Sequence, residues 1–384
     1  MIEPGVPSFS YIISLSKAAR KGNPLHWMRT FNNTKFVIKN FHMPINKNEI
    51  QNQSRREFLV KGSITSLGLL MTGSAAWSRS FFSAEKPTSK FFGVQIGVIT
   101  YSFRSMPGNA QQVMQYIIDS GISGIELMGD VVEEFAGKPV NPVKMTGSVP
   151  GQRPQFTDEQ KAQLAAYAKQ MAEWRSIVSM DKFKEIKKIY KKAGIDIYAF
   201  KPNALGSNNT DAEVEYALKA AKALGAHSVT VELPTDPAHS KRLGDLGAKH
   251  KMYIGYHAHT QATDTAWDIA LSQSPYNSMN LDCGHYIAAG GNNTKGTLLA
   301  LIEAKHDRIT TLHIKDRKTK TNGGANMPWG EGDTPVKEIL TLLKEKKYKI
   351  PATIELEYDI PAGSDAVKET KNCLAFSKSA LGAV

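Results

Sequence analysis

Short apolar segments alternate with segments of helical pattern along the chain from residue 94 onward. Most of the apolar segments lie about 25–40 residues apart, which is the length of one strand-plus-helix unit. The segments are Val94–Thr100, Ile122–Leu127, Ile195–Phe200, Ser228–Leu233, Tyr253–His257, Ser278–Leu281, Ile309–Ile314 and Ala352–Leu356. Such alternation predicts a parallel sheet covered by helices. A doubly wound sheet also alternates, but eight units favour a closed (β/α)₈ TIM barrel, which is the α/β fold class we predict.

Two of the connecting segments carry clear helix signals. Thr210 can cap a helix over Asp211–Leu224, and Gly225 stands directly after it, where helices often end in the left-handed conformation. Lys182–Lys192 has apolar residues at helical spacing and is predicted to be a second helix. Both helices fit the covering layer of a barrel.

The segment Val131–Met180, between the second and third apolar segments, is longer than one connecting unit. Its first part is rich in Pro, Gly and Lys and is predicted to be a long loop. Thr157–Ser176 then has a helical pattern, with Asp158 and Glu159 in its first turn. Long loops on the catalytic face of a barrel commonly shape the substrate pocket, so we expect this segment to border the site.

The positive charge of the chain is concentrated at its beginning. The 384 residues carry a formal net charge of +12, but residues 1–84 hold eleven of the 48 basic residues and three of the 36 acidic ones. The remaining chain therefore carries only +4, which is too weak a bias to indicate a nucleic-acid partner. The two cysteines, Cys283 and Cys373, can form one disulfide but provide neither a disulfide framework nor a cysteine-based zinc pattern.

The segment Ser54–Lys61, which contains Arg55-Arg56, resembles the twin-arginine export signature of bacteria. An uncharged, mostly apolar run follows over residues 62–77, with small residues beyond it where cleavage can occur. The run is shorter than the roughly 20 apolar residues of a transmembrane helix. The alternative is a chance arginine pair before a buried helix. We predict an N-terminal extension with a twin-arginine signal peptide over 1–84, a single barrel domain over 85–384, and export to the periplasm by the twin-arginine machinery.

The last four apolar segments end in residues that can bind a metal. In a barrel, the chemistry lies where the strands meet the helices that follow them. These ends read Tyr256-His257-Ala258-His259, Leu281-Asp282-Cys283-Gly284-His285, Leu312-His313-Ile314-Lys315-Asp316 and Ile354-Glu355-Leu356-Glu357. A single polar residue at a strand end is usually solvated or hydrogen-bonded. Four consecutive ends of this kind indicate a shared cation, which would remove the cost of burying these groups.

The order Tyr-His-x-His, Asp-x-x-His, His-Ile-Lys-Asp, Trp-Gly-x-Gly-Asp and Ile-Glu resembles the sugar phosphate isomerase/epimerase family with the xylose-isomerase-like barrel, from about residue 94 to the C-terminus. The resemblance implies one divalent metal held from strands five to eight, with His257, Asp282, His313 and Glu355 as ligands. Such a mixed nitrogen and oxygen donor set suits Mn²⁺, Co²⁺, Fe²⁺ or Zn²⁺ better than Mg²⁺ or Ca²⁺.

The chain departs from the family pattern at one point. Many epimerases of the family have glutamate on strand five, where this chain has His257, and their two glutamates exchange a proton across the sugar. Glu355 can keep the role of general base here. Its catalytic partner is predicted to be Glu232, for which simple surface solvation is an equal alternative.

Further residues near the strand ends are candidates for the site. We predict His285 as a third catalytic residue and Glu126, His259, Lys315, Arg317 and Trp329 as substrate-binding residues. Packing or solvation is the alternative for each, and His259 could replace His257 as a ligand because alternate residues of a strand point the same way. Trp329–Asp333 is predicted to form a tight turn that closes the pocket, with glycine needed for its backbone.

The candidate chemistry allows several functions on a small-molecule sugar. The first is an isomerase or epimerase that acts on a keto-sugar through an enediolate, and the second is a lyase or hydratase of 3-keto-glycosides or related oxidised sugars. Export and the histidine at position 257 favour the second to some degree. A third is a non-catalytic periplasmic sugar-binding protein. The sequence disfavours DNA repair of the endonuclease IV type, because that type needs histidines on early strands and none occurs between His42 and His227.

Overall fold

The computed structural model describes residues 86–106, 108–143 and 155–383. The N-terminal extension and twin-arginine signal predicted over 1–84 lie outside the described residues, and the domain boundary at residue 85 stays a prediction.

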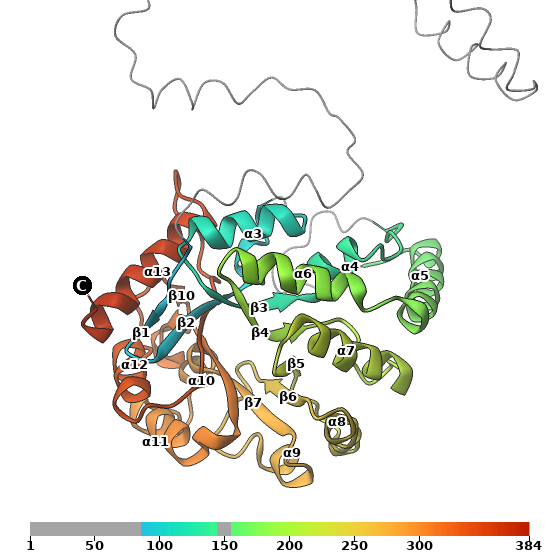
Figure 1. Cartoon of the computed structure of the whole chain (residues 1–384). Coiled ribbons are helices and arrows are strands. Elements are labelled where there is room, and N and C mark those ends of the chain that lie inside the picture. Colours follow the sequence, from blue (N-terminus) through green and yellow to red (C-terminus); the bar gives the residue numbers. More distant parts are fainter. Residues whose placement is uncertain (1–85, 107, 144–154, 384) are drawn as a thin grey trace, which may run out of the picture. The chain divides into compact units, whose positions relative to one another are not determined.

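Eight parallel strands close into a barrel (Figure 1). They are β2 (Val94–Ile99), β3 (Gly124–Met128), β4 (Asp196–Lys201), β5 (Ser228–Glu232), β6 (Tyr253–His257), β7 (Asn277–Asp282), β8 (Ile309–Ile314) and β11 (Ala352–Ile354). Each strand pairs with the next, and β11 returns to β2 in parallel register, with Thr353 opposite Gly97. The eight apolar segments and the TIM barrel predicted from the sequence are confirmed.

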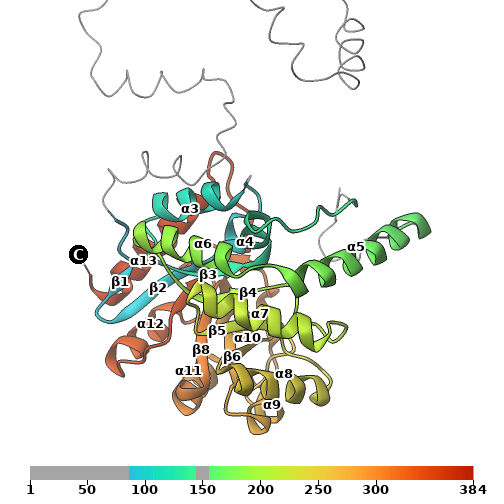
Figure 2. The same cartoon turned by 45° about the vertical axis from the view of Figure 1, so that its right-hand side comes forward.

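Helices surround the barrel on the outside, as Figures 1 and 2 show from two directions. They are α3 (Ala110–Asp119), α4 (Gly129–Phe135), α5 (Asp158–Ile177), α6 (Asp181–Lys192), α7 (Asp211–Leu224), α8 (Pro237–His250), α9 (Asp268–Gln273), α10 (Cys283–Ala289), α11 (Lys295–Lys305), α12 (Val336–Glu345) and α13 (Ala366–Leu381). Single 3₁₀ turns occur at η3 (Thr100–Phe103), η4 (His306–Arg308) and η5 (Lys320–Asn322). Short strands β1 (Lys90–Phe91), β9 (Asp316–Arg317) and β10 (Asn326–Met327) pair antiparallel outside the barrel ladder.

The helices with sequence signals begin and end close to the predicted residues. The Thr210 hydroxyl accepts a hydrogen bond from the backbone N–H of Glu213 and completes a capping box for α7, while Gly225 ends it with φ of 87°. The helices α5 and α6 are each found within one residue of their predicted limits. Residues 131–135 were predicted as loop and are helical instead, because α4 follows β3 directly and buries Val132 against the core.

The interior of the barrel contains buried polar side chains. Alternate strand residues face inward, and those on β7 and β8 include the fully buried Asn280 and Thr311. Also inside the barrel, the Tyr198 hydroxyl lies 2.7 Å from Thr353 Oγ1. Gly97 leaves the space that the Tyr198 ring needs, because a Cβ at position 97 would collide with the Tyr198 oxygen. The outward-facing apolar residues pack under the helices. This division leaves the inside of the barrel free to carry chemistry.

In the described part of the chain, no helix combines the length and the apolar character needed to cross a membrane.

Candidate metal centre

The four predicted ligands come together at the C-terminal ends of β6, β7, β8 and β11. One donor atom from each of His257, Asp282, His313 and Glu355 lies within 4.8 Å of the others, and all four residues are buried. Strand register produces this meeting, because Asp282 pairs with His313 and β11 is the next strand around the barrel. Two imidazoles and two carboxylates thus converge as the sequence predicts, whereas their role as ligands stays a prediction.

The ammonium group of Lys315 already holds a positive charge at this cluster. Its Nζ lies 3.0 Å from Asp282 Oδ2, 2.8 Å from Glu355 Oε2 and 2.7 Å from Glu357 Oε2. Burial works to lower the pKa of Lys315, but these carboxylates raise it above its usual value. Asp282 Oδ2 is buried and forms no aligned hydrogen bond with any described residue, despite its contact with the ammonium. The cluster therefore offers a cation negative charge and, in Asp282 Oδ2, a buried oxygen with an ion-pair contact but no hydrogen bond, which fits a divalent metal.

His313 lies between two carboxylates. Its Nε2 is 2.8 Å from Glu126 Oε2, and its Nδ1 is 2.9 Å from Glu355 Oε2. Burial would lower the pKa of His313, but the charges of Glu126 and Glu355 raise it to about 10. Nδ1 faces the cluster, whereas Nε2 faces Glu126 beneath it. A carboxylate behind a ligating imidazole fixes the ring and raises its basicity. The position of Glu126, fully buried under His313, fits this orienting role better than the predicted contact with substrate.

Asn280 determines which nitrogen of His257 carries hydrogen. The Asn280 amide Nδ2 donates to Thr311 Oγ1 at 2.7 Å and to Glu126 Oε2 at 3.1 Å, so its oxygen must face His257. That oxygen lies 3.0 Å from His257 Nδ1, which therefore donates and leaves Nε2 with a lone pair for a metal. Burial, followed by the charge of His313, lowers the pKa of His257 to about 4 and keeps its ring neutral.

Sequence reasoning missed Asn280, although one signal was present. It stands two residues before Asp282 on the same strand, so the two side chains point to the same inner face of the barrel.

His285 and Arg317 form one wall beside the cluster. The His285 backbone N–H donates to Asp282 Oδ1 at 2.6 Å, which fixes the start of α10. Its ring nitrogens lie 3.1 Å from Lys315 Nζ and 2.6 Å from Arg317 Nη1. A neutral imidazole has one acceptor nitrogen, so only one of these cations can be hydrogen-bonded at a time. Burial lowers the pKa of His285 to about 3.

A second wall contains Glu232 and His259. Glu232 Oε2 lies 3.1 Å from His259 Nε2, and Glu232 Oε1 lies 2.9 Å from Lys201 Nζ at the end of β4. The hydrogen bond with Glu232 raises the pKa of His259. The His259 and His285 rings stack with centroids 4.6 Å apart. His257, His259 and His285 also form a second group that could hold a metal, but His259 is half exposed and already paired. Lys201 was missed, and nothing in its local sequence distinguished it from a solvated lysine.

The turn predicted at 329–333 is present and is held by Asp316. This carboxylate accepts hydrogen bonds from the backbone N–H groups of Gly330, Gly332 and Thr334 at 2.8, 2.9 and 3.1 Å. Trp329 packs edge-on against Phe376 of α13 at 5.9 Å, and its indole N–H is buried without a hydrogen bond to any described residue. The substrate contact predicted for Trp329 stays a prediction.

Comparisons with known proteins agree with this barrel. The sequence profile described as the xylose isomerase-like TIM barrel matches residues 155–378. The solved structure of the probable 3-DHS dehydratase AsbF, involved in petrobactin synthesis in Bacillus anthracis, is 14% identical with a TM-score of 0.51, covering 73% of this chain and 98% of that one. The apo structure of the 3-keto-D-glucoside 4-epimerase YcjR from E. coli is 13% identical with a TM-score of 0.50, covering 74% and 99%.

A xylose isomerase domain protein from Alicyclobacillus acidocaldarius is also similar, at 13% identity and a TM-score of 0.50, covering 75% of this chain and 98% of that one. At these identities the likeness establishes the fold alone. No curated protein matches the sequence.

Proposed function

Because the chain belongs to the xylose isomerase-like TIM barrel family, we propose that it is a metal-dependent enzyme that isomerises or epimerises a keto-sugar through an enediolate. The observation that carries this proposal is the buried cluster of two imidazoles and two carboxylates at the ends of four neighbouring strands. Solved structures with the same barrel include a 3-keto-D-glucoside 4-epimerase, which supports a sugar substrate. The fold hosts many reactions, so the side chains of the site carry the argument.

The metal would be held by His257 through Nε2, Asp282, His313 through Nδ1, and Glu355. A divalent ion such as Mn²⁺, Co²⁺, Fe²⁺ or Zn²⁺, when bound, polarises the sugar carbonyl and stabilises the negative charge that develops on enolisation. Asn280 holds His257 in the tautomer that presents Nε2, and Glu126 holds the His313 ring from behind.

The base and the charged groups come from this chain. Contacts with Lys315 and His313 outweigh burial and hold the pKa of Glu355 well below its usual value, so its carboxylate is ionised and can accept a proton from carbon. The Lys315 ammonium can donate to the sugar oxygen on which charge develops, since it lies 2.8 Å from the same carboxylate. His285 stays neutral and can hydrogen-bond a sugar hydroxyl once Lys315 turns away from it.

One observation favours a second candidate, a lyase or hydratase of 3-keto-glycosides. His259, paired with Glu232, has a raised pKa and follows β6, whereas Glu355 follows β11, three strands further around the barrel. An ionised base on one side and an imidazole with a raised pKa on the other suit elimination, because one can remove a proton while the other can protonate the leaving group. The dehydratase among the similar structures shows that a related barrel supports loss of a substituent.

Deuterium exchange separates these functions. Metal-loaded protein is incubated in D₂O with methyl 3-keto-β-glucoside and with free ketoses, and the products are followed by NMR. Deuterium on carbon without release of methanol supports isomerisation or epimerisation, whereas release of methanol supports the lyase. Glu355→Gln should abolish both. If wild-type protein binds the sugar and catalyses neither reaction, the chain is a sugar-binding protein and the enzymatic proposal is wrong.

We also propose that the protein acts in the periplasm after twin-arginine export, on the strength of Arg55-Arg56 and the apolar run that follows. Fractionation of cells that produce the wild type and a double variant, Arg55→Lys with Arg56→Lys, tests this. Retention of only the variant in the cytoplasm supports export, and equal distribution of the two proteins contradicts it.

A further inference from the structure

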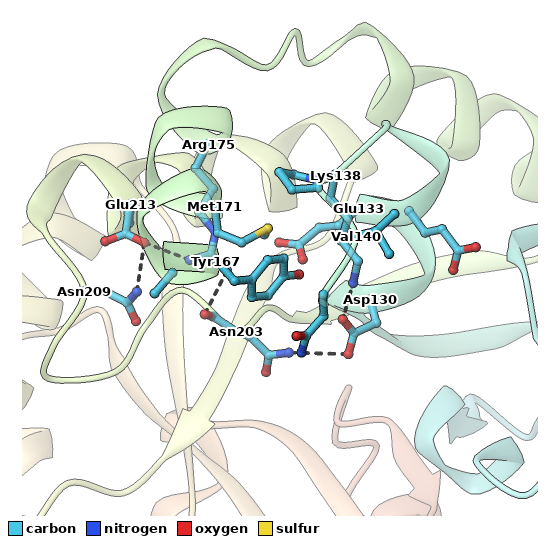
Figure 3. Close-up of a pocket in the computed structure, with 14 residues that line it drawn as sticks. Asp130, Glu133, Lys138, Val140, Tyr167, Met171, Arg175, Asn203, Asn209 and Glu213 are labelled. Atoms are coloured by element: carbon cyan, nitrogen blue, oxygen red, sulfur yellow. Dashed lines mark hydrogen bonds and ion pairs between the residues drawn. The ribbon is translucent and has the colours of Figure 1, made fainter. Parts of the chain in front are cut away.

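A hollow of about 700 Å³ lies outside the four-residue cluster, between α4, α5 and the segment after β4. Figure 3 shows Tyr167 and Met171 of α5 on one side of it, Glu133 of α4 on another, and Asn203 below. Its volume is in the range of pockets that bind small molecules. None of the predicted site residues lines it.

The hollow borders the same end of the barrel as the metal centre. The helix α4 begins at Gly129, three residues after Glu126, and Asn203 stands two residues after Lys201. The Asn203 amide lies 3.4 Å from Asp130 Oδ2 and joins the two segments at the base of the hollow, as Figure 3 shows. The hollow therefore lies on the β3 and β4 side of the barrel mouth, at the end of the barrel that carries the four-residue cluster.

The polar framework of the hollow is fixed by buried contacts. Arg175 is 8% exposed, and it contacts Glu213 at 2.8 Å and the Asn203 carbonyl oxygen at 3.0 Å. Its Nε is buried without a hydrogen-bond partner among the described residues. Glu133 is 1% exposed and accepts a hydrogen bond from Tyr216 Oη at 3.0 Å. Such groups are costly to bury unless they are paired, so these contacts fix the shape of the lining around the hollow.

The charge of the lining disfavours anions. Four acidic residues line the hollow against two basic ones, Lys138 and Arg175. Both basic residues are already paired, Lys138 with Asp130 and Arg175 with Glu213. Among the described residues of the lining, no basic side chain is left unpaired to neutralise a phosphate or a carboxylate of a ligand.

The apolar part of the lining supplies a surface for a ring. Tyr167 is half-buried, and its hydroxyl forms no hydrogen bond with the described part of the chain, while Met171 and Val140 lie around it. A sugar ring has an apolar C–H face and a rim of hydroxyl groups. Tyr167 fits the face, and the amide and carboxylate groups around it can each donate to or accept from hydroxyls.

We propose that this hollow binds a second, neutral sugar ring, so that the substrate is a glycoside of two or more residues rather than a sugar phosphate. The inference rests on the proposed function for the ring held at the metal centre. The second ring supplies binding energy at a distance from the reacting carbon, which positions the first ring for reaction.

Binding of sugars that are not oxidised tests the proposal without any turnover. Metal-loaded protein is titrated, with NMR detection, with methyl β-glucoside, with the neutral disaccharides cellobiose, maltose and trehalose, and with glucose 6-phosphate. We expect at least one disaccharide to bind about tenfold more tightly than methyl β-glucoside, which corresponds to about 1.4 kcal/mol, and glucose 6-phosphate to have no such advantage. Tyr167→Ala and Asn203→Ala should each bring this ratio close to one.

The matched control is Tyr253→Ala, which removes an exposed tyrosine at the other end of the barrel and should keep the wild-type ratio. Thermal unfolding shows whether each variant is folded. Equal binding of mono- and disaccharides by the wild type, an unchanged ratio in Tyr167→Ala, or an advantage for glucose 6-phosphate overturns the inference. If the ratio behaves as expected but keto-sugars show no deuterium exchange, the pocket stands and the proposed function fails.

Discussion

Replacement of Asn280 by alanine tests whether this amide controls the metal centre. Its oxygen accepts from His257 Nδ1 at 3.0 Å, and its nitrogen donates to Glu126 and Thr311. Without the amide, nothing fixes the His257 tautomer, and Nε2 is protonated part of the time. We expect Asn280→Ala to fold but to bind Zn²⁺ or Mn²⁺ more weakly.

The size of the effect follows from the contacts that are lost. Loss of a partner behind a metal-bound imidazole typically costs about 10–100-fold in affinity. The variant also leaves Glu126 Oε2 and Thr311 without the amide donor, and unmet buried polar groups cost about 1–3 kcal/mol each. We therefore expect a free energy of unfolding lower by roughly 2–5 kcal/mol in the metal-free protein, in which Glu126 Oε2 keeps its contact with His313.

Ser278→Ala is the matched control for this variant. Ser278 is a buried polar residue two positions earlier on β7, and its hydroxyl donates to the Ile254 carbonyl oxygen at 3.0 Å without contact to any proposed ligand. Calorimetric titration with metal and chemical unfolding in the presence of chelator separate affinity from stability. Ser278→Ala should lose stability alone. If Asn280→Ala binds metal as tightly as the wild type, or if both variants lose affinity equally, the tautomer argument is wrong.

Three further predictions address the charges and the loop around the centre. Lys315→Met removes the cation that competes for the carboxylates, so calorimetry should find metal bound at least as tightly, while turnover falls about 10²–10⁴-fold; weaker metal binding would contradict the competition. Gly332→Ala places a Cβ in collision with Asp316 Oδ1, so the free energy of unfolding by denaturant should fall by about 1–3 kcal/mol. An unchanged free energy of unfolding would show that the loop over residues 329–333 shifts to accept the Cβ without cost. In chelated protein, the folded-state pKa values of His257 and His285 are about 4 and about 3, against 6.5 in the unfolded chain. The unfolded state therefore binds protons first, and the free energy of unfolding falls as pH drops from 6.5 toward 4, by up to about 3 kcal/mol for His257 alone. Denaturation curves that coincide at pH 7 and pH 5 would refute this pH dependence.

The barrel could be predicted because its strands have an apolar outer face and regular spacing. The meeting of His257, Asp282, His313 and Glu355 could be predicted because all four stand at strand ends, and a parallel barrel brings such ends together whatever their separation in sequence. These two features depend on local pattern and topology alone, which a single sequence contains.

The remaining parts of the site depend on which side chain packs beside which. Glu126 also ends a strand segment, but only the structure places it under His313 rather than at the mouth of the barrel. Asn280 is one of several inward polar residues, and its importance comes from its contact with His257 across to the next strand. The hollow beside Tyr167 requires α5 to stand beside α4, and no periodicity in the sequence specifies that placement.

The contacts of Lys315 explain how several carboxylates can be buried together at this cluster. Asp282, Glu355 and Glu357 surround one ammonium group, and the neighbouring His313 carries a second positive charge between Glu126 and Glu355. Buried carboxylates left unpaired would cost several kcal/mol each, and these two cations offset that cost. A divalent ion placed among the same oxygens would supply the charge that both cations now provide. His257, Asp282, His313 and Glu355 would hold that ion, and Lys315 would stand beside them with its ammonium available to donate to a substrate oxygen.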